Sequence, residues 1–208
     1  MPDEGNTTVA ENLRERRRRQ TRAELHAAAL RLVRELGFDR VTVEMISKEA
    51  GVSPRTFFNY FPTKEAALLI LPSGPSAEEA ERFAALPGSD PGTVLRDVGD
   101  LLARPLEELP FSRAEVSEAA RIAEAAPTVL AAVLAGFELL ERELVVLIAR
   151  RLGEDPEAEL PALLAGMCTT AVRLGTRRWA QAGPGTPGAA ECVRHAFALV
   201  NHLVPPTA

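Results

Sequence analysis

The chain has 208 residues, of which 46% are hydrophobic and 25% charged, as in an ordinary globular protein. No apolar run reaches membrane-spanning length and the first residues are polar and acidic, which excludes a signal peptide, so we expect a cytoplasmic protein. The net charge of −5 is uneven, with +2 on residues 1–65 and −7 on residues 66–208. Because an acidic surface repels DNA, any nucleic-acid binding must be confined to the N-terminal part.

Residues 1–13 are polar and lack an apolar pattern, which predicts a disordered N-terminal arm. Six arginines follow within nine positions: Arg14, Arg16, Arg17, Arg18, Arg19 and Arg22. Such a run is most often a solvated face, but beside a DNA-reading motif it is what attraction to phosphates requires. We take Arg17 and Arg18 as candidate DNA contacts.

Apolar residues at helical spacing from Leu25 to Leu36 predict one face of a long first helix that ends at Gly37. Thr42 is a good N-cap, and the apolar residues after it predict a short helix up to Ala50. Gly51 easily takes the left-handed conformation that turns a chain sharply. Ser53 followed by proline then marks the start of another helix.

This second short helix, residues 54–60, can dock through Phe57 and Phe61, which are four positions apart. The residues left facing outward are Arg55, Thr56, Phe58, Asn59 and Tyr60. Two short helices joined by a tight glycine turn are typical of the helix-turn-helix, whose second helix enters the major groove. The alternative is an ordinary helical hairpin whose aromatic residues are merely core.

The stretch from Arg17 to Leu69 resembles the N-terminal DNA-binding domain of the TetR family of transcriptional regulators. The resemblance rests on Gly-Phe, then Thr-Val-x-x-Ile-x-x-x-Ala-Gly-Val-Ser, then Phe-Phe-x-Tyr-Phe-x-x-Lys-Glu. It implies an all-helical homodimer, usually a repressor, that binds a palindromic operator and releases it when a small molecule occupies a separate C-terminal domain.

The resemblance also implies DNA contacts. The positions at which the family touches phosphates or base edges are occupied here by Thr42, Ser53, Thr56, Asn59, Tyr60 and Lys64. Arg55 stands where a glycine is frequent, and it offers a bidentate contact to guanine. Phe58 replaces a frequent tyrosine and so lacks the hydroxyl that could donate to a phosphate.

The rest of the chain is also predicted to be helical. A capping box of Ser112 and Glu115 starts one of these helices, and Pro127 starts another that ends at Gly153. The predicted ranges are 64–71, 76–86, 93–108, 113–125, 127–152, 157–182 and 189–203. We therefore predict an all-α fold with a disordered arm (1–13), a three-helix helix-turn-helix domain (14–65) and a helical effector-binding and dimerisation domain (66–208).

The last two helices are candidates for the dimer interface that the resemblance implies. On the first of them, small and polar residues form a narrow strip that includes Ala162, Gly166 and Thr170. On the second, Val193, Ala196, Phe197 and Val200 form an apolar face, which Cys192, Leu199 and Leu203 widen. Small residues permit close approach of helices, so tight packing within one chain is the alternative interpretation.

No catalytic constellation, metal site or cofactor motif is present in the sequence, so we predict neither an enzyme nor a cofactor. Cys168 and Cys192 are interpreted as small buried hydrophobic residues. The effector is expected to be mostly apolar, and its pocket cannot be placed; the basic cluster of Arg173, Arg177 and Arg178 could hold an anionic group or be surface charge. The alternatives are an architectural DNA-binding protein without effector and a helical enzyme with a vestigial motif.

Overall fold

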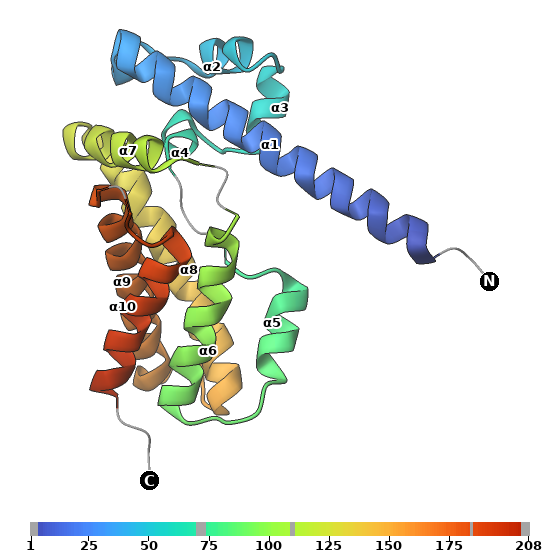
Figure 1. The fold of residues 1–208 in the computed structure, drawn as a ribbon, viewed down its shortest axis with the longest axis vertical. Helices are drawn as coiled ribbons and strands as arrows, with labels where there is room; N and C mark the ends of the chain where they lie inside the picture. Colours follow the sequence, from blue (N-terminus) through green and yellow to red (C-terminus); the bar gives the residue numbers. More distant parts are fainter. Residues whose placement is uncertain (1–3, 70–73, 109–110, 184, 205–208) are drawn as a thin grey trace. The chain divides into compact units, whose positions relative to one another are not determined.

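The computed structural model describes residues 4–69, 74–108, 111–183 and 185–204, with side chains from residue 17 onward. It is all-helical, as predicted, and these residues contain no strand. The chain divides into two units, residues 1–70 with 110–132 and residues 71–109 with 133–208 (Figure 1). Within the described ranges no helix is both long and apolar enough to cross a membrane.

The first unit contains the N-terminal elements and one helix from the middle of the chain. Its elements are α1 (Glu4–Leu36), η1 (Phe38–Arg40), α2 (Val43–Glu49), α3 (Pro54–Phe58), α4 (Lys64–Ala67), α7 (Arg113–Ala125) and the first turns of α8 (Pro127–Leu152). Helix α1 ends where predicted, because Gly37 has a φ of 82° and its N–H donates to the carbonyl of Val33 at 2.8 Å. Residues 4–13, expected to be disordered, form the first turns of α1.

The second unit contains α5 (Ala77–Ala84), α6 (Pro91–Ala103), η2 (Arg104–Leu106), the rest of α8, α9 (Glu159–Gln181) and α10 (Ala189–Leu203). Helix α10 packs against both α9 and α6. Two glycines allow this: a Cβ on Gly175 would lie 2.5 Å from the Cα of Val193, and one on Gly99 would lie 2.7 Å from the ring of Phe197. The three helices are therefore packed too closely for side chains at those positions.

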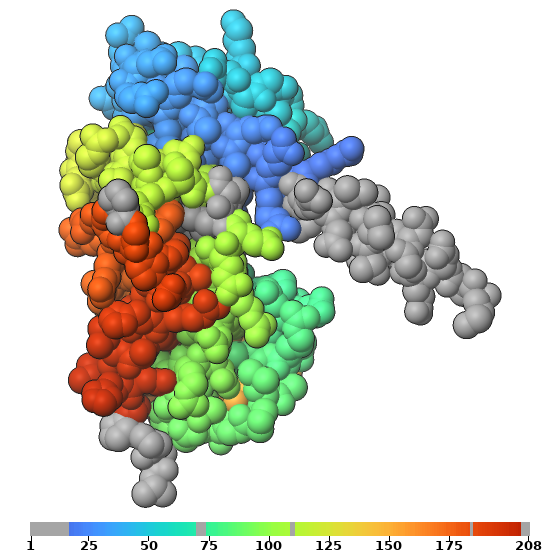
Figure 2. Space-filling model, in the orientation of Figure 1, coloured from blue at the N-terminus to red at the C-terminus, as the bar shows by residue number. Residues whose placement is uncertain are grey.

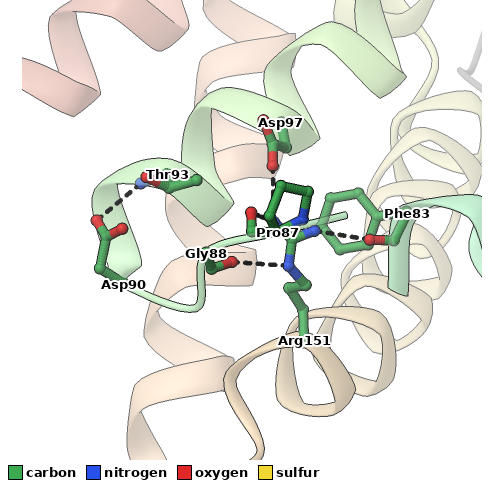
Figure 3. A network of polar contacts seen from close by, with 7 residues as sticks. All are labelled: Phe83, Pro87, Gly88, Asp90, Thr93, Asp97 and Arg151. Atoms are coloured by element: carbon green, nitrogen blue, oxygen red, sulfur yellow. Dashed lines mark hydrogen bonds and ion pairs between the residues drawn. The ribbon is translucent and has the colours of Figure 1, made fainter. Parts of the chain in front are cut away.

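The connection between α5 and α6 is held by one buried arginine (Figure 3). The side chain of Arg151, in the last turn of α8, is 2% exposed and donates hydrogen bonds to the carbonyls of Phe83, Pro87 and Gly88 at 2.6–2.9 Å. It also pairs with Asp97 at 2.9 Å. Because each of its three nitrogens donates to an oxygen, the buried guanidinium fixes the loop instead of destabilising the interior.

The helix boundaries mostly follow the sequence, but the division into units differs from the predicted domains. The capping box of Ser112 and Glu115 is confirmed, and α8 ends before Gly153 as predicted. However, α7 and the start of α8 group with the N-terminal unit, whereas the prediction placed all residues after 65 in the second domain. The helix predicted over 64–71 ends at Ala67, and the stop predicted at residue 72 lies outside the described residues.

Candidate nucleic-acid interface

Helices α2 and α3 have the caps and the turn that the sequence predicts. The N–H of Met45 donates to the hydroxyl oxygen of Thr42 at 3.3 Å, and that of Thr56 donates to Ser53 at 3.0 Å. Between the helices Gly51 has a φ of 70°, which a residue with a Cβ rarely adopts. These local interactions start two short helices that would be unstable alone.

Two phenylalanines anchor α3 to the unit. Phe57 is fully buried and Phe61 is 2% exposed. Their ring centroids lie 5.8 Å apart, and the guanidinium of Arg22 on α1 lies 5.4 Å from the centre of the Phe61 ring. The predicted docking face of α3 is thus the observed one, and the opposite face is left for solvent or a ligand.

The outward face of α3 carries the predicted contact residues. Arg55, Phe58 and Asn59 are exposed, while Thr56 and Tyr60 are half-buried. Thr42 and Ser53, the two capping residues, are exposed as well. These side chains are brought together around one short helix, which is the arrangement that reading a groove requires.

Lys64, a predicted DNA contact, also has partners within the chain. Its ammonium donates hydrogen bonds to the carbonyls of Phe38 at 3.1 Å and Val41 at 2.9 Å, and it lies 4.2 Å from the centre of the Phe38 ring. These bonds use two of the three N–H donors of the ammonium, so one donor remains for a phosphate. Lys64 thus ties α4 to the chain segment that enters α2, and its contact with DNA stays a prediction.

The arginines of α1 are only partly described. Arg17 and Arg18 are exposed, so both have room to approach a phosphate. Arg22 is half-buried, and burial together with the charge of Arg18 lowers the pKa of its guanidinium. The side chains of Arg14 and Arg16 lie outside the described residues.

A buried histidine in this unit was not singled out by its sequence. His26 on α1 is fully buried, and its Nδ1 lies 2.8 Å from the carbonyl oxygen of Ala67 at the end of α4. Its ring also meets that of Phe111, just before α7, edge-on at 4.6 Å. Because a carbonyl only accepts, Nδ1 carries the proton, and burial lowers the pKa of the ring.

The predicted interface residues separate into two groups. Val193, Ala196 and Phe197 are at most 3% exposed because α10 packs against α9 and α6 of the same chain. The interface interpretation is corrected for these three, which have no free surface to offer. Gly166 and Val200 are half-buried; Ala162 and Thr170 are exposed. The same two helices also expose large apolar side chains: Leu160, Leu163, Leu174, Leu199 and Leu203.

Helices α6 and α10 lie side by side on the face shown in Figure 2, and between them is an open groove of about 380 Å³. Its rim includes Arg96 and Arg194, and Arg194 is already paired with Asp100 and Glu107. We therefore assign no ligand to it.

Arg173, Arg177 and Arg178 are exposed. The described part of the chain contains no group of three His, Cys, Asp or Glu side chains able to hold a metal ion.

The chain is similar in sequence to known proteins. Residues 25–69 match the family model described as bacterial regulatory proteins, tetR family. The chain is 30% identical over 196 residues to the HTH-type transcriptional regulator TcmR of Streptomyces glaucescens, covering 86% of this chain and 81% of that protein. It is 39% identical over 72 residues to the HTH-type transcriptional regulator EthR of Mycolicibacterium smegmatis, covering 31% and 33%. The structure of Thermus thermophilus FadR, a TetR family repressor in complex with lauroyl-CoA, is 26% identical, covers 86% of this chain and 92% of its own, and gives a TM-score of 0.43.

Proposed function

Because the chain belongs to the TetR family of bacterial regulatory proteins, whose members bind DNA, dimerise and bind small molecules, we propose that it represses transcription from a pseudo-palindromic operator. In this proposal a homodimer reads the operator through α3 of each protomer. A small, mostly apolar ligand bound in the second unit makes the homodimer release the operator. The observation that carries the proposal is the outward face of α3, held in place by Phe57 and Phe61.

The proposed contacts follow from the chemistry of that face. The hydroxyl oxygen of Thr42 accepts from a backbone N–H and its hydroxyl hydrogen-bonds to the carboxylate of Glu44, so a phosphate contact by Thr42 would replace that carboxylate. The hydroxyls of Ser53 and Thr56 lie 2.8 Å apart, so one donates to the other and a single proton remains for DNA. Arg55 supplies the fork of donors that matches the acceptors of guanine, and Asn59 and Tyr60 complete the reading face. Arg17 and Arg18 add contacts to phosphates.

The proposed dimer surface consists of the exposed residues of α9 and α10. Leu163, Leu174, Leu199 and Leu203 are each more than half exposed, and burying such side chains is the main source of stability in an association. Ala162 and Thr170 lie among the exposed residues of α9 and would permit close approach. A two-fold dimer places its recognition helices about 34–36 Å apart, or somewhat more, and so requires an inverted repeat.

Light scattering at micromolar concentration tests the dimer. Leu163→Glu should shift the protein toward monomer, because a carboxylate buried in an apolar interface is costly. The matched control is Leu86→Glu, which changes a 45% exposed leucine just after α5 and should leave the mass unchanged. A monomeric wild type would refute the dimer, and an unchanged mass for Leu163→Glu would show that Leu163 is not in the dimer interface.

Selection of bound fragments from random-sequence duplexes tests sequence-specific reading. The proposal predicts one enriched inverted repeat, bound about a thousandfold or more tightly than random DNA. An architectural DNA-binding protein would instead enrich no sequence and would bind every duplex with the same steep salt dependence. A protein that binds no duplex at all would contradict both.

Release by a ligand is tested by thermodynamic linkage. The interior of the second unit is aliphatic, with Val94, Leu95, Leu144 and Ile148 fully buried, which favours a mostly apolar effector. Compounds are first screened for a rise in melting temperature, and the strongest is then titrated with and without operator DNA. Linkage requires that the operator weaken the binding of the compound by the same factor by which the compound weakens the binding of the operator, typically ~5–150-fold. An affinity unchanged by operator would show that this compound does not regulate DNA binding.

A further inference from the structure

Phe58 places an apolar ring in the middle of an otherwise polar face. Its side chain is 56% exposed, whereas the neighbouring Phe57 is fully buried and Phe61 is 2% exposed. Single apolar residues on a surface are normal and need no explanation by themselves. This ring, however, lies on α3 between the exposed Arg55 and Asn59, on the face proposed to enter the groove.

The Phe58 ring is held in place from beneath. It packs edge-on against Phe57, with the ring centroids 5.5 Å apart and the planes at 87°. Since Phe57 is fixed in the core of the unit, the position of the Phe58 ring depends on a rigid neighbour. A side chain ordered in this way loses little conformational entropy when it binds, so its contact contributes more of its energy to affinity.

The chemistry of the ring limits what it can recognise in DNA. A phenyl ring has no donor for a phosphate oxygen and none for the acceptors of guanine or adenine. In the major groove the 5-methyl group of thymine is the apolar feature that distinguishes one base from another, and phenylalanine is among the side chains that contact it. We propose that Phe58 contacts the methyl group of one thymine in each half-site and thereby determines part of the operator sequence. This inference rests on the proposed function.

The helix also determines where that thymine lies. Arg55 and Phe58 are three residues apart on α3, and both are exposed, so they share a face. Residues at this spacing have Cβ atoms about 5–6 Å apart. Since successive base pairs rise by about 3.4 Å, the two side chains reach bases about one or two steps apart. The half-site should therefore contain a guanine read by Arg55 and, one or two base pairs away, a thymine read by Phe58.

The test removes only the methyl group. In the duplex obtained by selection, each thymine is replaced in turn by deoxyuridine, which pairs identically but lacks the 5-methyl. At the thymine read by Phe58 the affinity should fall about fourfold for one half-site and about fifteenfold for both, the equivalent of one buried CH₂ per half-site. Replacement at other thymines should have little effect.

Two variants assign the loss to the ring. With Phe58→Ala the thymine and uracil duplexes should bind equally, while Phe58→Tyr keeps the ring and should keep the preference. Both change an exposed position, and unchanged melting temperatures would show that α3 is intact. If the wild type binds a selected sequence but discriminates uracil at no position, or if Phe58→Ala retains the discrimination, the inference is wrong and the proposed function stands. If selection enriches no sequence, both fail.

Discussion

Helices α2 and α3 of the first unit and helices α9 and α10 of the second are built in opposite ways. Helix α3 is only five residues long, and its buried face is a single phenylalanine supported by Phe61 just after it. Helices α9 and α10 have 23 and 15 residues and approach so closely that Gly175 has no room for a Cβ. The first pair keeps its apolar surface small and presents side chains outward. Helices α9 and α10 bury their main apolar surfaces within the chain, so only their remaining exposed side chains can contact a partner molecule.

The largest expected effect tests the packing of α10. Phe197→Asp removes an aromatic side chain that contacts Gly99 and places a carboxylate in the same site, so the free energy of unfolding should fall by about 5 kcal/mol. Urea denaturation measures it. Ala198→Asp, at the exposed neighbouring position, should be nearly neutral. If the Phe197→Asp protein were as stable as the wild type but monomeric, Phe197 would belong to the dimer interface after all.

The next effect concerns the buried arginine of the second unit. Arg151→Met keeps much of the volume but leaves three carbonyls and Asp97 without their donors, and it should lower the free energy of unfolding by about 3 kcal/mol. Arg150→Met is the matched control, because Arg150 is exposed and pairs with exposed Glu81, so its urea midpoint should hardly change. Equal midpoints for the two variants would mean that the Arg151 network does not hold the loop.

The same contrast explains what could be predicted from sequence. Thr42, Gly51 and Ser53 act through partners within about one helical turn, so their spacing alone predicted both helices and the turn. Lys64 and Phe197 act through partners distant in the chain, at Phe38 and Val41 and at Gly99. The sequence pattern indicates whether such a residue is exposed or buried in its own helix, but it does not reveal which distant residue it contacts. The two short helices, their turn and the outward face of α3 were therefore largely predictable, whereas the backbone contacts of Lys64, the burial of His26 and the inner face of α10 were not.

A smaller effect tests the exposed face of α3 directly. Arg55→Ala should cost about 1–3 kcal/mol of binding free energy on the selected operator and relax the preference at one base pair. The control is Arg96→Ala on α6, which removes the same charge from an exposed position of the other unit. Fluorescence anisotropy with operator and random duplexes measures both. An equal loss on the two duplexes would mean that Arg55 contacts phosphate only.

The smallest effect is a pH dependence from the buried histidine. His26 has a lowered pKa in the folded protein, where Arg22 and Glu115 are the nearby charged groups and α4 presents the carbonyl of Ala67. Above pH ~6.5 the ring is neutral in both states and has no effect. As the pH falls below that value the unfolded chain binds a proton that the folded chain does not, so stability declines, by at most ~1.4 kcal/mol per pH unit.

This dependence is measured as the change in urea midpoint between pH 7.5 and 5.5. His26→Gln keeps a donor for the Ala67 carbonyl but does not titrate, so its midpoint should change less than that of the wild type over this interval. The interval lies above the range in which carboxylates ordinarily titrate, and the difference between the wild type and His26→Gln assigns the effect to this histidine. If the wild type and His26→Gln lose the same stability, the titrating group lies elsewhere.

Two-fold reading by a pair of α3 helices is tested most directly by changing the spacing of the operator. Inserting about five base pairs between the half-sites turns one of them to the opposite side of the duplex, because a helical turn takes about 10–10.5 base pairs. The affinity should then fall to that of a duplex in which one half-site has been scrambled, at least about a hundredfold below the intact operator. An affinity unchanged by the insertion would show that each protomer reads DNA alone, and would contradict a dimer with fixed recognition helices.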